Sequence, residues 1–311
     1  MTETTLSLIL LGTGNATVTE CFNTCFVLKD ASRPVYDRCF LVDGGGGNGL
    51  LTQMKHAGID WREVRSVFIS HRHADHIVGI FWMMRNILSG MKHGSYTGEA
   101  SIYGHSESIH ILRGMAGLMF TPEEIACIDS RLHLVTVEDG EEVRILGRRV
   151  VFYDIHSVKT RQFGFTMELK PNGDGVSADP VGAKEGEDPG AGSDEGARPD
   201  GNRRESRVLA FYGDEPARES TLRYMEHADW VLHEAFCLYE DADRFRPYEK
   251  NHSTVKDACE TAERMGVPNL VLYHTEDSDL LNRRRRYTAE GRQYYHGNLL
   301  VPEDLDVIRL V

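Results

Sequence analysis

One short segment decides the fold of this chain, and it runs Ser70-His71-Arg72-His73-Ala74-Asp75-His76. It follows the apolar run Ser66-Val67-Phe68-Ile69, which is typical of a buried strand. Three imidazoles and a carboxylate at the end of such a strand suit a divalent metal of the zinc class. A solvated polar loop is the alternative. In an extended turn the ligands fall into two adjacent groups, so the segment predicts a paired-metal site with access to water, which is hydrolytic by default.

Composition limits the class of protein. The chain has 311 residues, 41% hydrophobic and 27% charged, which is ordinary for a soluble globular protein of one large or two small domains. The acidic start, Met1-Thr2-Glu3-Thr4-Thr5, leads directly into an apolar strand, so we expect no signal peptide and a cytoplasmic location. The six cysteines form no CxxC pair and are interpreted as reduced structural thiols, with a metal or disulfide role for Cys21 and Cys25 as the alternative.

The net charge of −13 bears on the partners. A protein that grips nucleic acid through many phosphates usually presents a basic face. Extended, non-specific nucleic-acid binding is therefore disfavoured, and any basic contact surface has to be local.

Strand and helix patterns alternate along the chain. Strands are expected at 6–11, 26–28, 39–42, 66–70, 101–105, 132–137, 142–145, 149–155, 163–169, 208–212, 230–234, 270–274 and 307–310. Helices are expected at 50–57, 76–88, 106–119 (opened by a cap at Ser106) and 255–265. Polar residues stand repeatedly at strand ends, namely Asp43, His71, His156, Asp214, Glu234 and His274. This arrangement predicts an α/β layered fold, with two packed sheets, helices outside, and one shared edge that carries the ligands.

Two segments have a local interpretation. Residues 44–47 are four glycines, which can form a phosphate cradle or a tight, close-packed turn; no Walker Gly-Lys-Ser/Thr follows, so the turn is favoured, with Asp43 as an anchor behind the metals. Residues 171–206 lose all apolar periodicity and are rich in Gly, Pro, Asp and Glu, which predicts a flexible acidic insertion in a single metallo-hydrolase domain spanning 1–311.

The ligand-like residues in their order along the chain resemble the metallo-β-lactamase superfamily. The resemblance spans nearly the whole chain and implies an αββα sandwich with two divalent metal ions, for which zinc is expected, with manganese or iron as alternatives. It implies that one ion is held by His71, His73 and His156, the second by Asp75, His76 and His274, and that Asp214 bridges both.

A second set of motifs is similar to the ribonuclease Z (tRNA 3′-end endonuclease) branch. It comprises Leu11-Gly12-Thr13-Gly14, His233-Glu234-Ala235-Phe236 and Lys250-Asn251-His252-Ser253-Thr254. The resemblance implies that His252 assists at the scissile phosphate, that Glu234 orients it, and that the protein is a homodimer. Ser253 and Thr254 precede a helix whose N-terminus would favour phosphate, so they are candidate substrate-binding residues; a plain capping segment is the alternative.

The chain also departs from ribonuclease Z. The interval that holds the basic tRNA-gripping arm in that family is acidic here, which would repel an RNA backbone. The run Asn282-Arg283-Arg284-Arg285-Arg286-Tyr287 follows His274, and Arg283 and Arg284 are candidates for a substrate-phosphate clamp, although a solvated strip is the commoner role for such a run.

The leading hypothesis is a two-metal phosphodiesterase in which a metal-bridged hydroxide attacks phosphorus, Asp75 accepts its proton and His252 assists the leaving oxygen. Its substrate would be a phosphodiester, either RNA or a small nucleotide, and no membrane is involved. A second hypothesis is a hydrolase of small esters, lactones or thioesters. A third is a non-enzymatic metal-binding interaction module.

Overall fold

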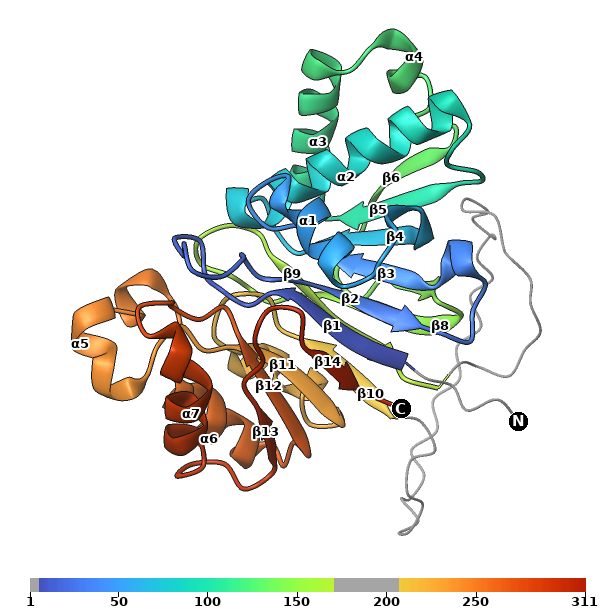
Figure 1. Ribbon diagram of the computed structural model, residues 1–311. Helices are drawn as coiled ribbons and strands as arrows, with labels where there is room; N and C mark the ends of the chain where they lie inside the picture. The colour runs from blue at the N-terminus through green and yellow to red at the C-terminus, as the bar shows by residue number, and fades with distance from the viewer. Residues whose placement is uncertain (1–5, 171–206) are drawn as a thin grey trace, which may run out of the picture.

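The fold is an αββα sandwich, seen in a computed structural model that describes residues 6–170 and 207–311. Two seven-stranded mixed sheets pack face to face, with helices on both outer sides (Figure 1). The insertion expected at 171–206 lies outside the described residues. Within the two described ranges, no helix has both the length and the apolar character required to cross a bilayer.

The first sheet has the strand order β14-β1-β2-β3-β4-β5-β6. Its strands are β1 (Leu6–Gly12), β2 (Cys25–Asp30), β3 (Cys39–Val42), β4 (Val64–Ile69), β5 (Ala100–Gly104), β6 (Leu132–Thr136) and β14 (Val307–Arg309). Its outer face is covered by α1 (Gly49–His56), α2 (Ala74–His93) and α3 (Ser106–Met119), and the short α4 (Pro122–Ile125) packs on α2 (Figure 1).

The second sheet has the order β13-β12-β11-β10-β9-β8-β7. Its strands are β7 (Glu142–Ile145), β8 (Arg148–Asp154), β9 (Phe163–Glu168), β10 (Val208–Phe211), β11 (Trp230–Glu234), β12 (Asn269–Tyr273) and β13 (Asn298–Leu300). The helices of this half are α5 (Ala242–Phe245), α6 (Val255–Arg264) and α7 (Leu280–Gly291), and α6 and α7 cover the outer face of the sheet (Figure 1).

Alternation along the strands builds the layers. In β1, Leu8 and Leu10 face the core between the two sheets, whereas Ile9 and Leu11 face the core beneath α1 and α2. Because neighbouring side chains of a strand point to opposite faces, a strand that is apolar at every position fits only a sheet covered on both sides. The apolar runs of the sequence therefore require the sandwich.

The long predicted elements agree with the structure, which adds the short elements α4, α5 and β13 that the sequence patterns did not predict. Ser106 does not cap α3: the N-cap position belongs to His105, and no side-chain cap bond forms there. Helix α7 was not expected, because its arginine run hides the spacing of the residues that it buries, Arg283, Tyr287 and Gly291. The six cysteines are free thiols and four are buried, so Cys21 and Cys25 form no disulfide.

Parallel strand pairing gathers the polar strand ends. Strands β3 to β6 run parallel in the first sheet, and β10 to β13 run parallel in the second. Their carboxyl ends deliver Asp43, His71, Asp214, Glu234 and His274 to the same region. The loops at these carboxyl ends lie next to one another, which is where layered α/β proteins usually place their functional residues.

One buried ion pair ties the two sheets together. Arg148 of β8 is fully buried, and its guanidinium donates to Asp30 of β2 at 2.5 Å and to the Leu146 and Leu169 carbonyls at 2.9 and 3.1 Å. Burial alone raises the pKa of Asp30, but hydrogen bonds from Ser32 and Arg148 outweigh it and lower that pKa below its usual value. The pair is therefore charged at neutral pH.

Replacing one partner tests this contact. We expect R148M to lower the free energy of unfolding by about 3–5 kcal/mol, because it leaves the Asp30 carboxylate buried and uncompensated. The double variant D30L/R148M should recover part of the loss, as measured by urea denaturation. A single variant as stable as the wild type would contradict the role of the pair.

Candidate metal centre

The centre is built on the turn between β4 and α2. His71 lies two residues beyond β4, His73 is the N-cap residue of α2, and Asp75 and His76 occupy the first helical turn. The extended backbone at His73 and the helical start after it turn these four side chains toward one another. The helix N-terminus favours the Asp75 carboxylate at this place.

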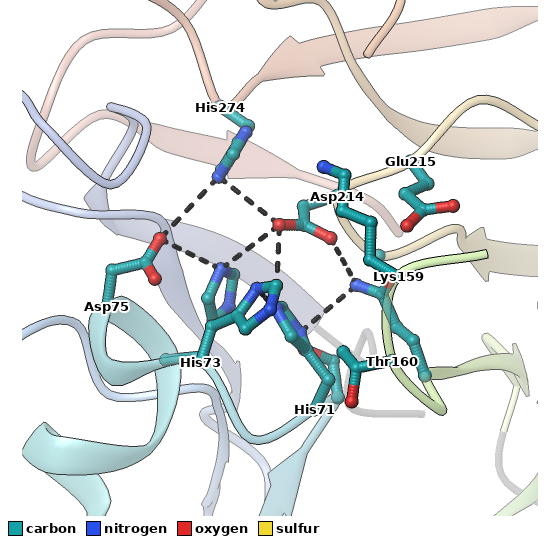
Figure 2. Close-up of polar contacts among 12 residues, drawn as sticks. His71, His73, Asp75, Lys159, Thr160, Asp214, Glu215 and His274 are labelled. Carbon is teal, nitrogen blue, oxygen red and sulfur yellow. Dashed lines mark hydrogen bonds and ion pairs between the residues drawn. The ribbon is translucent and has the colours of Figure 1, made fainter. Parts of the chain in front are cut away.

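Asp214 lies at the middle of the cluster. Its Oδ2 atom is 3.5 Å from His71 Nε2, 3.7 Å from His76 Nε2 and 3.6 Å from His274 Nε2. Figure 2 shows these contacts converging on one carboxylate, which comes from the loop after β10. One oxygen facing three imidazoles, two from the turn between β4 and α2 and one from the loop after β12, has the position of a bridging ligand.

Three overlapping donor groups could each hold a cation, and one of them, Glu234, His252 and His274, lies beside the centre. The other two share His76. The first is His71, His76 and Asp214, and the second is Asp75, His76 and His274; within each group the ligand atoms lie within 4.8 Å of one another. The Nε2 atoms of His76 and His274 are buried and have no hydrogen-bond partner. Unpartnered buried nitrogens are costly unless something else satisfies them. The neutral nitrogens and hard oxygens therefore fit a divalent metal.

Asp43 supports the cluster from behind, as the sequence led us to expect. Its Oδ2 lies 2.8 Å from His76 Nδ1 and accepts a hydrogen bond from the Ser70 hydroxyl at 2.7 Å. The same hydroxyl lies 3.0 Å from His71 Nδ1. Because Nδ1 of each histidine is engaged with this network, Nε2 is left to face the centre, which is how outer groups orient metal-binding histidines.

The four glycines are a close-packed turn. Gly44 N–H donates to the His76 carbonyl at 2.8 Å, and Gly79 N–H donates to the Gly45 carbonyl at 2.9 Å. A Cβ atom on Gly79 would lie 1.7 Å from the Gly44 oxygen. The turn interpretation therefore holds: small residues let the strand end touch the helix that carries Asp75 and His76.

Burial and neighbouring charges shift the pKa values of the candidate ligands. Burial lowers the pKa of His71 and of His73, so both rings are neutral donors. Burial by itself would raise the pKa values of Asp75 and Asp214, but the neighbouring imidazoles outweigh it and lower both. At neutral pH the cluster therefore presents ionised carboxylates beside the neutral rings of His71 and His73. Burial alone would lower the pKa of His76, but the carboxylates of Asp75 and Asp43 outweigh it and raise that pKa, so this ring has to release a proton when it binds a metal.

His252 and Glu234 stand beside the centre. His252 Nδ1 is 3.6 Å from Glu234 Oε2, and the other Glu234 oxygen accepts the Ser253 N–H. The His252 ring stacks on Phe236 at 4.8 Å between centroids and lies 5.2 Å from the His274 ring. A carboxylate behind an imidazole that faces a metal centre is the arrangement of an oriented proton-transfer group.

The structure differs from the sequence-based expectation at His156. Its backbone is left-handed (φ 57°), its side chain is 53% exposed, and its Nδ1 lies 3.8 Å from Asp154, away from the donor groups. Gln162, which the sequence did not single out, is buried there instead: its amide donates to Asp214 Oδ1 at 2.6 Å and lies 3.1 Å from His71 Nδ1. An uncharged amide carries no sequence signal, so only the fold reveals it.

For Ser253 and Thr254 the structure favours the capping alternative over contacts with a substrate. Thr254 is fully buried and forms a capping box with Asp257 at the start of α6. Ser253 is 2% exposed and gives its backbone N–H to Glu234. Neither residue lines the pocket over the centre. Their role is to place His252 and its helix.

Both arginines of the expected clamp have partners within the fold. Arg283 is 2% exposed and donates to Thr275 Oγ1 at 2.8 Å and to the Pro302 carbonyl at 3.0 Å. Arg284 bonds the Val301 carbonyl and Asp306. Both guanidiniums tie α7 to the neighbouring segments at 275 and 301–306. Closeness to His274 in the sequence therefore did not place these side chains at the metal centre.

A pocket of about 380 Å³ opens over the centre. It is lined by Asn15, Ala16, Thr17, His73, Asp75, Lys159, Asp214, Phe236, Lys250, His252 and His274. A second hollow of about 400 Å³, lined in part by Arg218, Tyr248 and Asn251, shares His252 with it. A bound group can therefore reach the donor atoms and His252 at the same time.

The amino-acid sequence matches a known protein family. Residues 6–179, more than half of the chain, match the family model described as anti-Pycsar protein Apyc1. The chain belongs to this family. In sequence it is also similar to ribonucleases Z: 27% identical to that of Halorubrum lacusprofundi over 98% of this chain and 97% of the relative, and 28% identical to that of Archaeoglobus fulgidus over 73% and 75%.

Solved structures share the fold. The metallo-β-lactamase fold protein YhfI from Bacillus subtilis superposes with a TM-score of 0.68 at 15% identity, covering 98% of this chain and 99% of that one. Human tRNase Z, short form, gives 0.62 at 18% identity, covering 97% and 98%. The Apyc1-family chain is thus a metallo-β-lactamase-fold protein of the ribonuclease Z-like branch, as its motifs predicted.

The support from Asp43 is testable. We expect D43N to weaken binding of divalent metal by about 10–100-fold, because both Asp43 oxygens accept hydrogen bonds, one from the Ser70 N–H and the other from the Ser70 hydroxyl and His76, whereas an amide has a single acceptor oxygen. Metal titration of the apoprotein measures it, with D37A, at an exposed ion pair, as the matched control. Wild-type affinity in a folded D43N protein would exclude the orienting role.

Proposed function

We propose that this protein is a metal-dependent phosphodiesterase that holds two divalent ions, zinc by preference. The observation that carries the proposal is the position of Asp214 Oδ2, which faces both donor groups at 3.5–3.7 Å from three imidazoles. Paired metal sites about 4 Å apart suit displacement at phosphorus, because one ion serves the attacking oxygen and the other the leaving one. The names of the ribonuclease Z relatives agree with this chemistry.

Each side chain has a role in that reaction. Bound ions would polarise the phosphoryl group and lower the pKa of water at the centre. Asp75, ionised and facing the pocket, accepts the proton of the attacking water. His252 faces the same pocket with Glu234 behind it, so it can give a proton to the leaving oxygen. Gln162 fixes the carboxylate of Asp214.

A small phosphodiester is the substrate best supported. The pocket over the centre is of the size that suits a small ligand, and the chain carries a net charge of −13. The two arginines expected to grip a longer backbone are used inside the fold. We therefore propose a small nucleotide rather than a tRNA precursor as the substrate.

His156 stays a proposed ligand of the first ion. Its half-exposed ring lies on the loop after β8, whose turn also carries Lys159 into the pocket. An exposed imidazole changes rotamer readily, so a bound ion can recruit it to complete the tetrahedral set with His71 and His73. A homodimer and a cytoplasmic location are likewise proposals; the free thiols agree with a reducing compartment.

Replacing His252 tests the reaction. We expect H252A to lower turnover of a dinucleoside monophosphate by about 10²–10⁴-fold with metal content unchanged, because an alkoxide leaving group needs the proton. Turnover of bis(p-nitrophenyl) phosphate should fall much less, since its leaving group is a weak base. H296A, at an exposed histidine, is the control. Full activity of H252A on both substrates, or a wild type that cleaves lactones but no phosphodiester, would refute the proposal.

Metal stoichiometry tests His156. We expect H156A to lose one equivalent of metal and H296A to retain both, as measured by inductively coupled plasma mass spectrometry. If H156A keeps full occupancy, the first ion is held by the donors already gathered around Asp214, and His156 is no ligand.

A further inference from the structure

Lys159 lines the pocket over the metal centre, although no sequence motif predicted a role for it. It lies on the loop between β8 and β9, and it lines the pocket together with Asp75, Asp214 and His252. Its Nζ is 3.3 Å from His252 Nε2. Figure 2 shows Lys159 next to Asp214, on the side of the centre away from Asp75.

The ammonium has no carboxylate partner. Within residues 6–170 and 207–311, Lys159 forms no ion pair, although acidic groups surround the centre; its one polar side-chain contact is with His252 Nε2. The other lysine of the pocket, Lys250, is engaged differently, since its Nζ lies over the Phe236 ring at 4.8 Å. Lys159 is therefore the pocket cation that is free to meet an anion.

The loop holds this lysine by a specific tether. The Ser157 hydroxyl accepts the backbone N–H groups of Lys159 and Thr160 at 3.2 and 3.3 Å and donates to Glu215 Oε1 at 2.6 Å. Glu215 is 2% exposed and directly follows Asp214. The turn that presents Lys159 is thus fixed to the same segment that supplies the central carboxylate.

We propose that Lys159 is a substrate-binding residue whose ammonium holds a non-bridging oxygen of the phosphoryl group against the metal centre, and that Ser157 and Glu215 are positioning residues for it. The inference rests on the proposed phosphodiesterase function. A strongly hydrated ammonium on a flexible stem is a common phosphate ligand. In an acidic protein it also supplies the local positive charge that an incoming anion needs.

This role differs from that of His252 in its kinetic signature. A proton donor matters mainly when the leaving group is basic, whereas an anion contact matters for every phosphodiester. We expect K159M to lower kcat/KM by about 10–100-fold on both the dinucleoside monophosphate and bis(p-nitrophenyl) phosphate, the range for a lost charged hydrogen bond. K159R should recover part of the loss, and S157A should show a smaller loss of the same pattern.

Binding of inorganic phosphate by the metal-loaded protein gives a readout independent of turnover. Isothermal titration should show affinity about 10–100-fold lower in K159M than in the wild type. K55M, at an exposed lysine of α1, is the matched control and should bind like the wild type.

The outcomes separate the two proposals. Wild-type phosphate affinity in K159M, or a defect confined to the substrate with the basic leaving group, overturns the inference and leaves the phosphodiesterase standing. A wild type that turns over no phosphodiester, yet binds phosphate through Lys159, overturns the proposed function alone. A metal-loaded wild type that binds no phosphate also overturns the inference.

Discussion

The site depends on one buried carboxylate, that of Asp43. Its backbone is left-handed (φ 54°), a conformation that Asp tolerates better than most residues, and it lies directly after β3 with 1% exposure. From there it engages His76 directly and His71 through Ser70. The glycines that follow let α2 approach closely enough for these contacts. Without this anchor, the imidazoles at the strand end would have no fixed direction.

The rest of the centre follows from the pairing of two sheets. The first sheet supplies the ligand turn, and the second supplies Asp214 and His274 from the loops after β10 and β12, two parallel strands on either side of β11. Both donor groups that contain His76 combine residues from the two sheets. The buried Asp30–Arg148 pair and the aromatic contacts between the sheets, such as Phe68 on Phe152 at 4.8 Å, therefore bear on function, since they keep the two halves in register.

Much of this could be predicted from sequence, because metal ligands are few in kind and closely spaced. The run from His71 to His76 fixed the chemistry, and apolar runs on both strand faces required a covered sandwich. Arg283 and Arg284 were misjudged because distance along the chain says nothing about the face of a helix not yet recognised. Gln162 and Lys159 escaped notice because an amide and a surface-type lysine become significant only when a loop closes over the centre.

The proposed mechanism requires two ions, one on each side of Asp214, with His252 and Lys159 beside them. The most direct measurement is a crystal structure of the metal-loaded protein with anomalous scattering data. The account predicts two anomalous peaks about 4 Å apart with the Asp214 carboxylate between them. One peak, or peaks remote from Asp214, would contradict it.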